Sequence, residues 1–211
     1  MERILAIGDI HGCLDKLVSL MGIVDMNPKK DTLVFIGDYI DRGPQSKEVV
    51  DYLIDLVKRH SRVIFLKGNH EQMLDLYLSG ADRLSFLANG GYATLSSYSK
   101  YVSAAEANPI PGAHLDFFDN LRLYYETDQY IFVHAGLKSD IPIEEQDEWD
   151  MLWIRDEFIY SDFDFGKRVI FGHTPFRKPL VFHNKIGIDT GAVYGNKLTC
   201  VELPAVKFYS V

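Results

Sequence analysis

The pentapeptide GDIHG, residues 8–12, directly follows the apolar run RILAI at residues 3–7. A short apolar run bounded by glycine and polar residues is typical of a buried strand. Apolar residues then recur with the spacing of one helix face, at Leu14, Leu17 and Met21. GDIHG therefore stands where a buried strand is predicted to pass into a helix.

The same order recurs twice in the first half of the chain. Apolar runs at residues 32–36 (TLVFI) and 62–66 (RVIFL) precede GDYIDRG at 37–43 and GNHE at 68–71. Helix-spaced apolar residues follow each of them. Strands that alternate with helices in this way predict an α/β fold with parallel strands. In the second half we expect strands at residues 130–133, 168–171, 185–188, 198–203 and 206–209, the last of them antiparallel additions.

The chain is predicted to form one domain over residues 1–211. It contains no internal repeat, low-complexity tract or Pro/Ser-rich linker. The strand–helix alternation loosens over about residues 82–120, where Gly90-Gly91 and residues 109–112 interrupt the pattern. We interpret this stretch as a mostly helical insertion.

Composition and charge exclude several classes of protein. With 47% apolar and 25% charged residues, the chain is neither disordered nor fibrous. Its net charge of -8 argues against nonspecific binding of polyanions, so no nucleic-acid partner is expected. There is no signal-peptide pattern and no run of about 18 apolar residues, so we expect a cytoplasmic protein without a membrane partner. Cys13 and Cys200 lie far apart, which fits free thiols in a reducing compartment.

Polar side chains follow five of the predicted strands. In an open α/β sheet such strand ends form one rim, where ligands bind. Each group taken alone is typical of a turn or a structural histidine, but their recurrence at five strand ends indicates a site. The six candidate ligands are Asp9, His11, Asp38, Asn69, His134 and His173.

This set offers nitrogen and oxygen ligands without sulfur, which suits Mn, Fe, Zn, Co or Ni. Six ligands exceed the three that a catalytic zinc typically takes from the protein. Two divalent ions that share one carboxylate would use all six, and paired ions of this kind act in phosphoryl transfer.

The motifs at the ends of the predicted strands, taken together, resemble those of a known family. GDIHG, GDYIDRG and GNHE, followed by HAG at 134–136 and GH at 172–173, resemble the phosphoprotein phosphatase family of serine/threonine phosphatases. The resemblance is greatest to its compact bacterial and bacteriophage branch, within the calcineurin-like metallophosphoesterases. It extends from Ile4 to about Leu203. It implies a four-layer α/β/β/α sandwich with mixed sheets and a metal site at the C-terminal ends of the strands.

The resemblance also implies the ligand sets of two ions, most simply Mn²⁺. One ion would be bound by Asp9, His11 and Asp38, and the other by Asp38, Asn69, His134 and His173. A hydroxide activated by both ions would attack phosphorus directly, so no side chain is needed as the nucleophile. Cys13 lacks the Cys-x5-Arg phosphate loop of cysteine phosphatases, and we expect it in the core behind the first strand.

The same resemblance assigns the groups that contact substrate. His70 would protonate the leaving alkoxide, and Asp41 would hold its imidazole. Asn69 and His70 would line the substrate site. Arg42 and Arg155 would bind phosphate oxygens, for which a guanidinium offers a planar fork of donors. The alternatives are a surface salt bridge for Arg42 and an exposed helix arginine for Arg155.

The neighbouring segments are expected to be structural. Glu71 should support its loop by hydrogen bonds, and residues 189–192 (DTGA) should form a turn near the site. Asn-Gly-Gly at 89–91 fits either a substrate entrance or a turn. Four aromatic residues are interpreted as packing residues: Tyr124, Tyr125, Trp149 and Trp153.

Three hypotheses about the function remain: two enzymes that differ in substrate, and a noncatalytic scaffold. Relatives that cleave diadenosine tetraphosphate symmetrically share GDIHG and GHTP (residues 172–175), but tend to carry alanine in place of Asp41 and GNHD in place of GNHE. Asp41, Glu71 and Asn-Gly-Gly therefore favour a serine/threonine protein phosphatase acting on phosphoprotein or small phosphoesters. A noncatalytic phosphate-binding scaffold would be expected to lose ligands, and here all six are present.

Two expectations concern the rest of the chain. It ends soon after the last predicted strand, so nothing indicates a dedicated regulatory subunit. The acidic surplus is expected outside the metal site, over residues 140–150 and 156–164.

Overall fold

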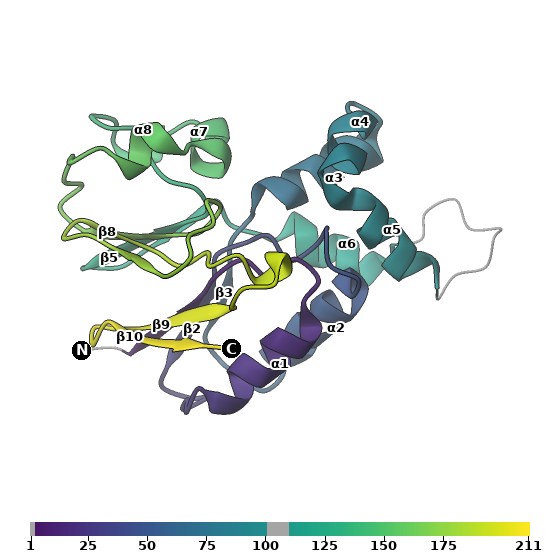
Figure 1. Ribbon diagram of the computed structural model, residues 1–211, viewed down its shortest axis with the longest axis horizontal. Helices are drawn as coiled ribbons and strands as arrows, with labels where there is room; N and C mark the ends of the chain where they lie inside the picture. Colours follow the sequence, from purple (N-terminus) through teal and green to yellow (C-terminus); the bar gives the residue numbers. More distant parts are fainter. Residues whose placement is uncertain (1–2, 101–109) are drawn as a thin grey trace.

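The computed structural model describes residues 3–100 and 110–211 (Figure 1). Within these residues the strands form two five-stranded sheets. The first has the order β10-β9-β1-β2-β3 and comprises β1 (Ile4–Ile7), β2 (Thr32–Phe35), β3 (Val63–Phe65), β9 (Thr199–Leu203) and β10 (Lys207–Ser210). The strands β1, β2 and β3 are parallel. As predicted, the last strands are added by antiparallel pairing, β9 with β1 and β10 with β9.

The second sheet has the order β4-β5-β6-β8-β7. Its strands are β4 (Tyr124–Glu126), β5 (Tyr130–Val133), β6 (Arg168–Phe171), β7 (Leu180–Val181) and β8 (Lys185–Gly187). The three central strands are parallel, whereas β4 and β7 pair antiparallel at the edges. The sequence did not predict β4 and β7, because edge strands of two or three residues are too short to show a period.

The existence of two sheets corrects the expectation that all five strand ends share the rim of one sheet. The two sheets pack face to face through alternate residues of their strands, among them Ile4, Ala6 and Val34 from the first and Phe132 and Ile170 from the second. Strands buried on both faces read as continuous apolar runs, which is why RILAI and TLVFI show no alternation.

Helices cover the two outer faces, so the four-layer α/β/β/α sandwich is confirmed. On the first sheet lie α1 (Leu14–Ile23), α2 (Ser46–Val57) and α3 (Asn69–Ser79), and their apolar side chains pack against Leu5, Ile7 and Phe35. On the second lie α7 (Glu148–Trp153) and α8 (Asp156–Ile159), which bury Met151 and Phe158. Figure 1 shows α7 and α8 on one side of the paired sheets and α1 and α2 on the other.

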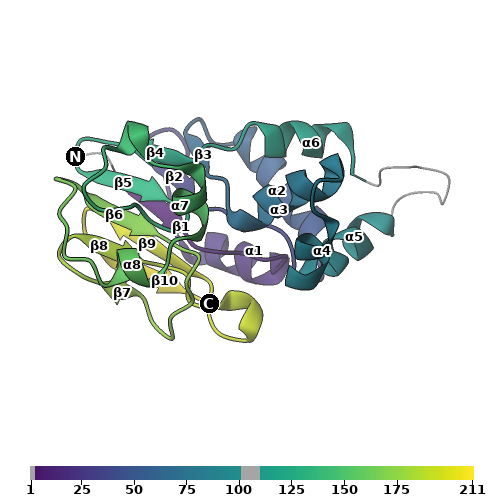
Figure 2. The same ribbon diagram turned by 90° about the horizontal axis from the view of Figure 1, so that it is seen from above.

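The stretch predicted as a helical insertion contains three short helices in its described residues. These are α4 (Arg83–Phe86), α5 (Tyr92–Ser99) and α6 (Gly112–Asp119), and a helical turn at Leu87–Gly91 joins α4 to α5. Residues 101–109 of the prediction lie outside the described residues. Figure 2 shows these helices grouped with α3 beside one end of the sheets. That the whole chain is one domain stays a prediction.

No helix in the described ranges combines the length and the apolar character needed to span a bilayer.

Candidate active site

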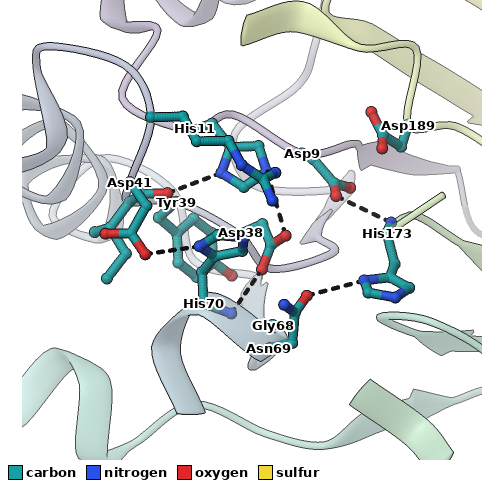
Figure 3. A network of polar contacts seen from close by, with 12 residues as sticks. Asp9, His11, Asp38, Tyr39, Asp41, Gly68, Asn69, His70, His173 and Asp189 are labelled. Carbon is teal, nitrogen blue, oxygen red and sulfur yellow. Dashed lines mark hydrogen bonds and ion pairs between the residues drawn. The ribbon is translucent and has the colours of Figure 1, made fainter. Parts of the chain in front are cut away.

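The candidate ligands come together where the C-terminal ends of strands from both sheets meet (Figure 3). Asp9 follows β1 and His173 follows β6, and the amide of His173 donates to Asp9 Oδ2 across 2.9 Å. The neighbouring Gly172 admits no side chain, since a Cβ there would lie 2.2 Å from Asp9 Oδ1. The glycine therefore allows the two sheets to approach at the site.

Asp38, which follows β2, lies at the centre of the cluster. Its Oδ2 is 3.3 Å from His11 Nε2, and its Oδ1 is 3.4 Å from His134 Nε2. Asn69 Oδ1 lies 3.0 Å from His134 Nε2 and 2.9 Å from His173 Nδ1. This arrangement places one carboxylate between two sets of nitrogen and oxygen donors.

Two groups of side chains are close enough to bind an ion, each with ligand atoms within 4.8 Å of one another. The first comprises His11, Asp38 and His70, and the second Asp38, His134 and His173. The predicted sharing of Asp38 agrees with this geometry. His70 stands in the first group in place of Asp9, whose Oδ2 is instead bound to the amide of His173.

The donor atoms fit divalent ions. Within residues 3–100 and 110–211, the buried polar side-chain atoms without a hydrogen-bond partner are Asp9 Oδ1, His70 Nε2, His173 Nε2 and Arg168 Nε. Three of these four belong to the cluster. Buried polar groups are normally hydrogen-bonded, so a concentration of unpaired ones indicates a missing charged partner.

The histidines present lone pairs to the cluster. Nδ1 of His11 donates to the carbonyl of Ile40 at 2.8 Å, and Nδ1 of His134 donates to that of Ile36 at 2.9 Å, so Nε2 carries the lone pair in each neutral ring. Burial lowers the pKa of His11 to about 3, and it lowers the pKa of His134 as well. Neutral imidazoles of this kind are the form that binds metal ions.

Several buried carboxyl groups surround the same point. Burial, together with the charges of Asp189 and Asp38, raises the pKa of Asp9 well above its ordinary value. Burial also raises the pKa of Asp189 to about 6. Asp38 differs: burial opposes its ionisation, but the surrounding histidines lower its pKa below the ordinary value. Divalent cations would compensate this concentration of negative charge.

Asp41 and His70 form a buried pair. Nδ1 of His70 lies 2.6 Å from Asp41 Oδ2, which leaves the buried Nε2 without a partner. The second oxygen of Asp41 accepts a hydrogen bond from Thr94 Oγ1 at 2.6 Å, and its amide donates to Thr94 Oγ1 and to Ser46 Oγ. The sequence did not single out Thr94 or Ser46. Thr94 is 53 residues from Asp41, and no spacing connects them.

Glu71 joins the loops that follow β2 and β3, as expected. Its Oε2 accepts from the amides of Asp38 and Gly68, both at 2.9 Å, and its Oε1 accepts from the amide of Tyr39 at 2.9 Å. Burial and the charge of Asp38 raise the pKa of Glu71 to about 8. This side chain therefore fixes the backbone that carries Asp38.

Arg42 lies beside the cluster, with Nη1 2.7 Å from His11 Nε2 and the guanidinium carbon 5.6 Å from the ring centre of Tyr194. Its amide donates to the carbonyl of Gly90 at 3.2 Å. A Cβ on Gly90, whose φ is 106°, would lie 2.8 Å from Arg42 Cγ. Asn-Gly-Gly is therefore a turn packed behind Arg42.

Arg155 follows α7 and is exposed, which agrees with the alternative of an exposed arginine. Its guanidinium nevertheless reaches the edge of the same cluster. Its Nη1 donates to the carbonyl of His173 at 3.3 Å and to Thr174 Oγ1 at 3.2 Å. The structure thus places both predicted phosphate-binding arginines around the six candidate ligands.

The loops of the site have an unusual backbone conformation. Among the described residues, seven that are not glycine have positive φ, and five of these belong to the site. Such conformations cost about 1–3 kcal/mol each and persist where surrounding contacts impose them. The five residues are His11, Asp38, Asp41, Arg42 and His173, with φ between 47° and 71°.

Of the expectations about other residues, one is wrong and one holds only in part. Cys13 is only partly buried, at the start of α1, and not in the core. Trp149 packs on Trp153 but is 59% exposed, whereas Tyr125 stacks on Phe132 as expected. The turn at residues 189–192 is confirmed by the 2.8 Å bond from the Gly191 amide to Asp189 Oδ1. The acids of residues 140–150 and 156–164 lie mostly at the surface, also as expected.

Comparison with known proteins agrees with this arrangement. The family model of the calcineurin-like phosphoesterases matches residues 2–201. Asymmetrical bis(5′-nucleosyl)-tetraphosphatase PrpE from Oceanobacillus iheyensis is 30% identical, and the match covers 99% of this chain and 92% of the relative. The enzyme of that name from Geobacillus sp. is also 30% identical, over 99% of this chain and 94% of the relative.

Among solved structures, a candidate diadenosine tetraphosphatase has the same fold, with a TM-score of 0.77 at 24% identity over 100% of this chain and 93% of that chain. The two mixed sheets with their outer helices, and the match of the family model to nearly every described element, lead to one conclusion. The chain belongs to the calcineurin-like phosphoesterase family and is a metal-dependent phosphoester hydrolase.

Proposed function

We propose that this protein hydrolyses dinucleoside tetraphosphates asymmetrically, releasing a nucleoside monophosphate and a nucleoside triphosphate. The observation that carries the proposal is the pair of possible metal-binding groups that share Asp38. The relatives that match nearly the full length of this chain are named as asymmetrical tetraphosphatases. The donor set supports the reaction class, and the names of the relatives support the substrate class.

Two divalent ions, with Mn²⁺ as the first candidate, would be held by the six predicted ligands: Asp9, His11, Asp38, Asn69, His134 and His173. When bound, such ions lower the pKa of a coordinated water and neutralise charge on phosphate oxygens. The chain contributes the orientation of these ligands, because carbonyls fix His11 and His134 and Glu71 fixes the loop of Asp38.

The remaining residues act on the substrate. Arg42 and Arg155, on either side of the cluster, would bind phosphate oxygens. His70 would donate a proton from Nε2 to the departing oxygen, while its Nδ1 stays bonded to Asp41 at 2.6 Å. Thr94 holds Asp41 from the opposite side, so the imidazole has one orientation.

The features that favoured a protein phosphatase at first do not discriminate between substrates. Glu71 supports the loop of Asp38, Gly90 packs behind Arg42, and Asp41 orients His70. All three serve the phosphoryl-transfer machinery, which is needed whatever the leaving group is. The names of the relatives therefore support the proposal of dinucleoside tetraphosphates as substrates.

Serine/threonine phosphatase activity is retained as a second candidate because of one observation. A serine or threonine alkoxide leaves poorly without a proton, and the buried Asp41–His70 pair suits a general acid. A nucleotide phosphate is a better leaving group and depends less on such an acid. The two candidates thus differ in how strongly catalysis should require His70.

The test is a substrate panel with metal-reconstituted protein. Diadenosine tetraphosphate, a phosphoserine peptide and p-nitrophenyl phosphate are compared by kcat/KM, and the nucleotide products are separated by chromatography. AMP and ATP in equal amounts are expected, with kcat/KM well above that for the peptide. Two ADP molecules would indicate the symmetrical reaction, and a faster peptide would favour the second candidate. Wild-type protein no more active than Asp38→Asn would indicate a noncatalytic scaffold.

A further inference from the structure

An aromatic pair stands exposed on α7, next to the candidate active site. Trp149 and Trp153 lie one helical turn apart, and their rings stack with centres 5.1 Å apart and an interplanar angle of 18°. Trp149 is 59% exposed. One face of its indole therefore rests on Trp153 while the other is left to solvent.

The pair is connected to the catalytic cluster on two sides. The ring of Trp153 meets that of His173 edge to face, with centres 6.1 Å apart. Nε1 of Trp153 donates to Gln72 Oε1 at 2.7 Å, and Gln72 belongs to α3, the helix that begins with Asn69 and His70. The rings thus form a continuous path from a candidate metal ligand to the surface.

The charges around the pair suit a neutral ligand. Glu148 and Asp150 flank Trp149 in α7, and Asp147 stands just before that helix. The only cation that reaches Glu148 among the described residues is Lys67, at 3.6 Å. An acidic surround repels a phosphate chain but does not oppose a neutral aromatic ring. Arg155, two residues beyond Trp153, contacts the His173 loop instead and marks where phosphate would lie.

We propose that the exposed face of Trp149 is a stacking platform for one purine base of the substrate, with Trp153 as its backing ring. The proposal rests on the proposed function, because a dinucleoside polyphosphate carries a base within reach of its phosphates. Stacking accepts any base, since every base has a π-face. Trp149 would then favour substrates that carry a base over plain phosphate chains, while the metal ligands and arginines act on phosphate.

Binding can be measured without turnover. Trp149 and Trp153 are the only tryptophans in the chain, so its intrinsic tryptophan fluorescence comes from this pair alone. AMP and ribose 5-phosphate differ only in the base and serve as matched probes with the metal-reconstituted protein. We expect AMP to quench the fluorescence and to bind about tenfold or more tightly than ribose 5-phosphate, with the difference lost in Trp149→Leu. Equal affinities of the two probes for wild-type protein would overturn the proposal.

Kinetics gives an independent readout. In Trp149→Leu, KM for diadenosine tetraphosphate should rise about tenfold relative to KM for inorganic tetraphosphate, and Trp149→Phe should recover part of the loss. Tyr160, 78% exposed just after α8, provides the matched control, and Tyr160→Leu should leave both constants unchanged.

The two proposals fail separately. If wild-type protein cleaves diadenosine tetraphosphate and Trp149→Leu has the same KM, the platform is refuted and the proposed function stands. If wild-type protein does not cleave it, the proposed function is refuted, and the comparison of AMP with ribose 5-phosphate still decides whether Trp149 binds a base.

Discussion

At the scale of single residues, the site depends on side chains that are held from two directions. Asp41 accepts from His70 on one oxygen and from Thr94 on the other, and all three residues are buried. A carboxylate held in this way keeps the ring in one orientation, with Nε2 directed at the cluster. The consequences for catalysis and stability can be tested separately.

Replacement of His70 by asparagine should reduce kcat about 10²–10⁴-fold, the usual contribution of a general acid. The loss should be larger for a phosphoserine peptide than for diadenosine tetraphosphate, because the alkoxide needs the proton more. Steady-state kinetics and metal analysis of the same preparation check this. A variant that has lost metal would instead identify His70 as a ligand, as its place in the first donor group allows.

Replacement of Thr94 by valine should destabilise the protein by about 1–3 kcal/mol, because a buried oxygen of Asp41 loses its donor. Turnover should also fall, although less than in His70→Asn, since the imidazole keeps its partner but the carboxylate is no longer held. Urea unfolding measures the first effect and kcat the second. Thr94→Ser retains the hydroxyl and should be close to wild type; an equally destabilised serine variant would show that the methyl group matters instead.

At the scale of elements, the helices α2, α5 and α6 are joined by one buried histidine. His114 of α6 lies with Nε2 3.0 Å from Asp51 of α2 and with Nδ1 2.8 Å from the hydroxyl of Tyr98 of α5. A neutral ring satisfies both partners, since Nε2 donates to Asp51 and Nδ1 accepts from Tyr98. Because α5 also carries Thr94, this link supports the helix that positions Asp41.

The titration of His114 should make stability depend on pH. Burial lowers the pKa of His114 below 6.5, although Asp51 opposes the shift. Below pH 6.5 the unfolded chain therefore takes up a proton that the folded chain does not, and folding stability falls as pH decreases. The free energy of unfolding of the metal-free protein, compared between pH 7.5 and about pH 5.5, should fall more in wild type than in His114→Gln. Equal slopes in the two proteins would contradict the assignment.

At the scale of the whole molecule, the two sheets meet at the cluster. Asp9, His11 and Asp38 follow strands of the first sheet, whereas His134 and His173 follow strands of the second. Asn69, at the start of α3, contacts both histidines of the second sheet. An ion bound to Asp38 and to these histidines would therefore link the two halves of the sandwich.

Metal removal should consequently affect folding as well as activity. After treatment with a chelator, activity should disappear and the melting temperature should fall, and both should return on addition of Mn²⁺. Metal at about a hundred times its dissociation constant contributes about 2.7 kcal/mol to stability. Asp38→Asn removes the ligand common to both donor groups and should show no metal-dependent rise in melting temperature. A rise as large as in wild type would place the ions elsewhere.

The chain's local patterns were enough to predict much of the molecule. Buried strands read as short apolar runs, so β1, β2, β5 and β6 could be located to within about a residue. The polar residues after them identified the ligand types, because strand ends and glycine turns are local features. The same patterns could not reveal the substrate, since Asp41, Glu71 and Gly90 serve chemistry that every phosphoester of this class requires.

The sequence by itself therefore determined the α/β class, the candidate ligands and the two arginines. Only the tertiary structure decided that two sheets carry the site, that Thr94 supports Asp41, and that Trp149 faces solvent while it stacks on Trp153, the neighbour of His173. The physical reason is distance along the chain. Periodicity records which face of an element is buried, whereas contacts between residues tens of positions apart depend on how sheets and helices pack, and no local pattern encodes that packing.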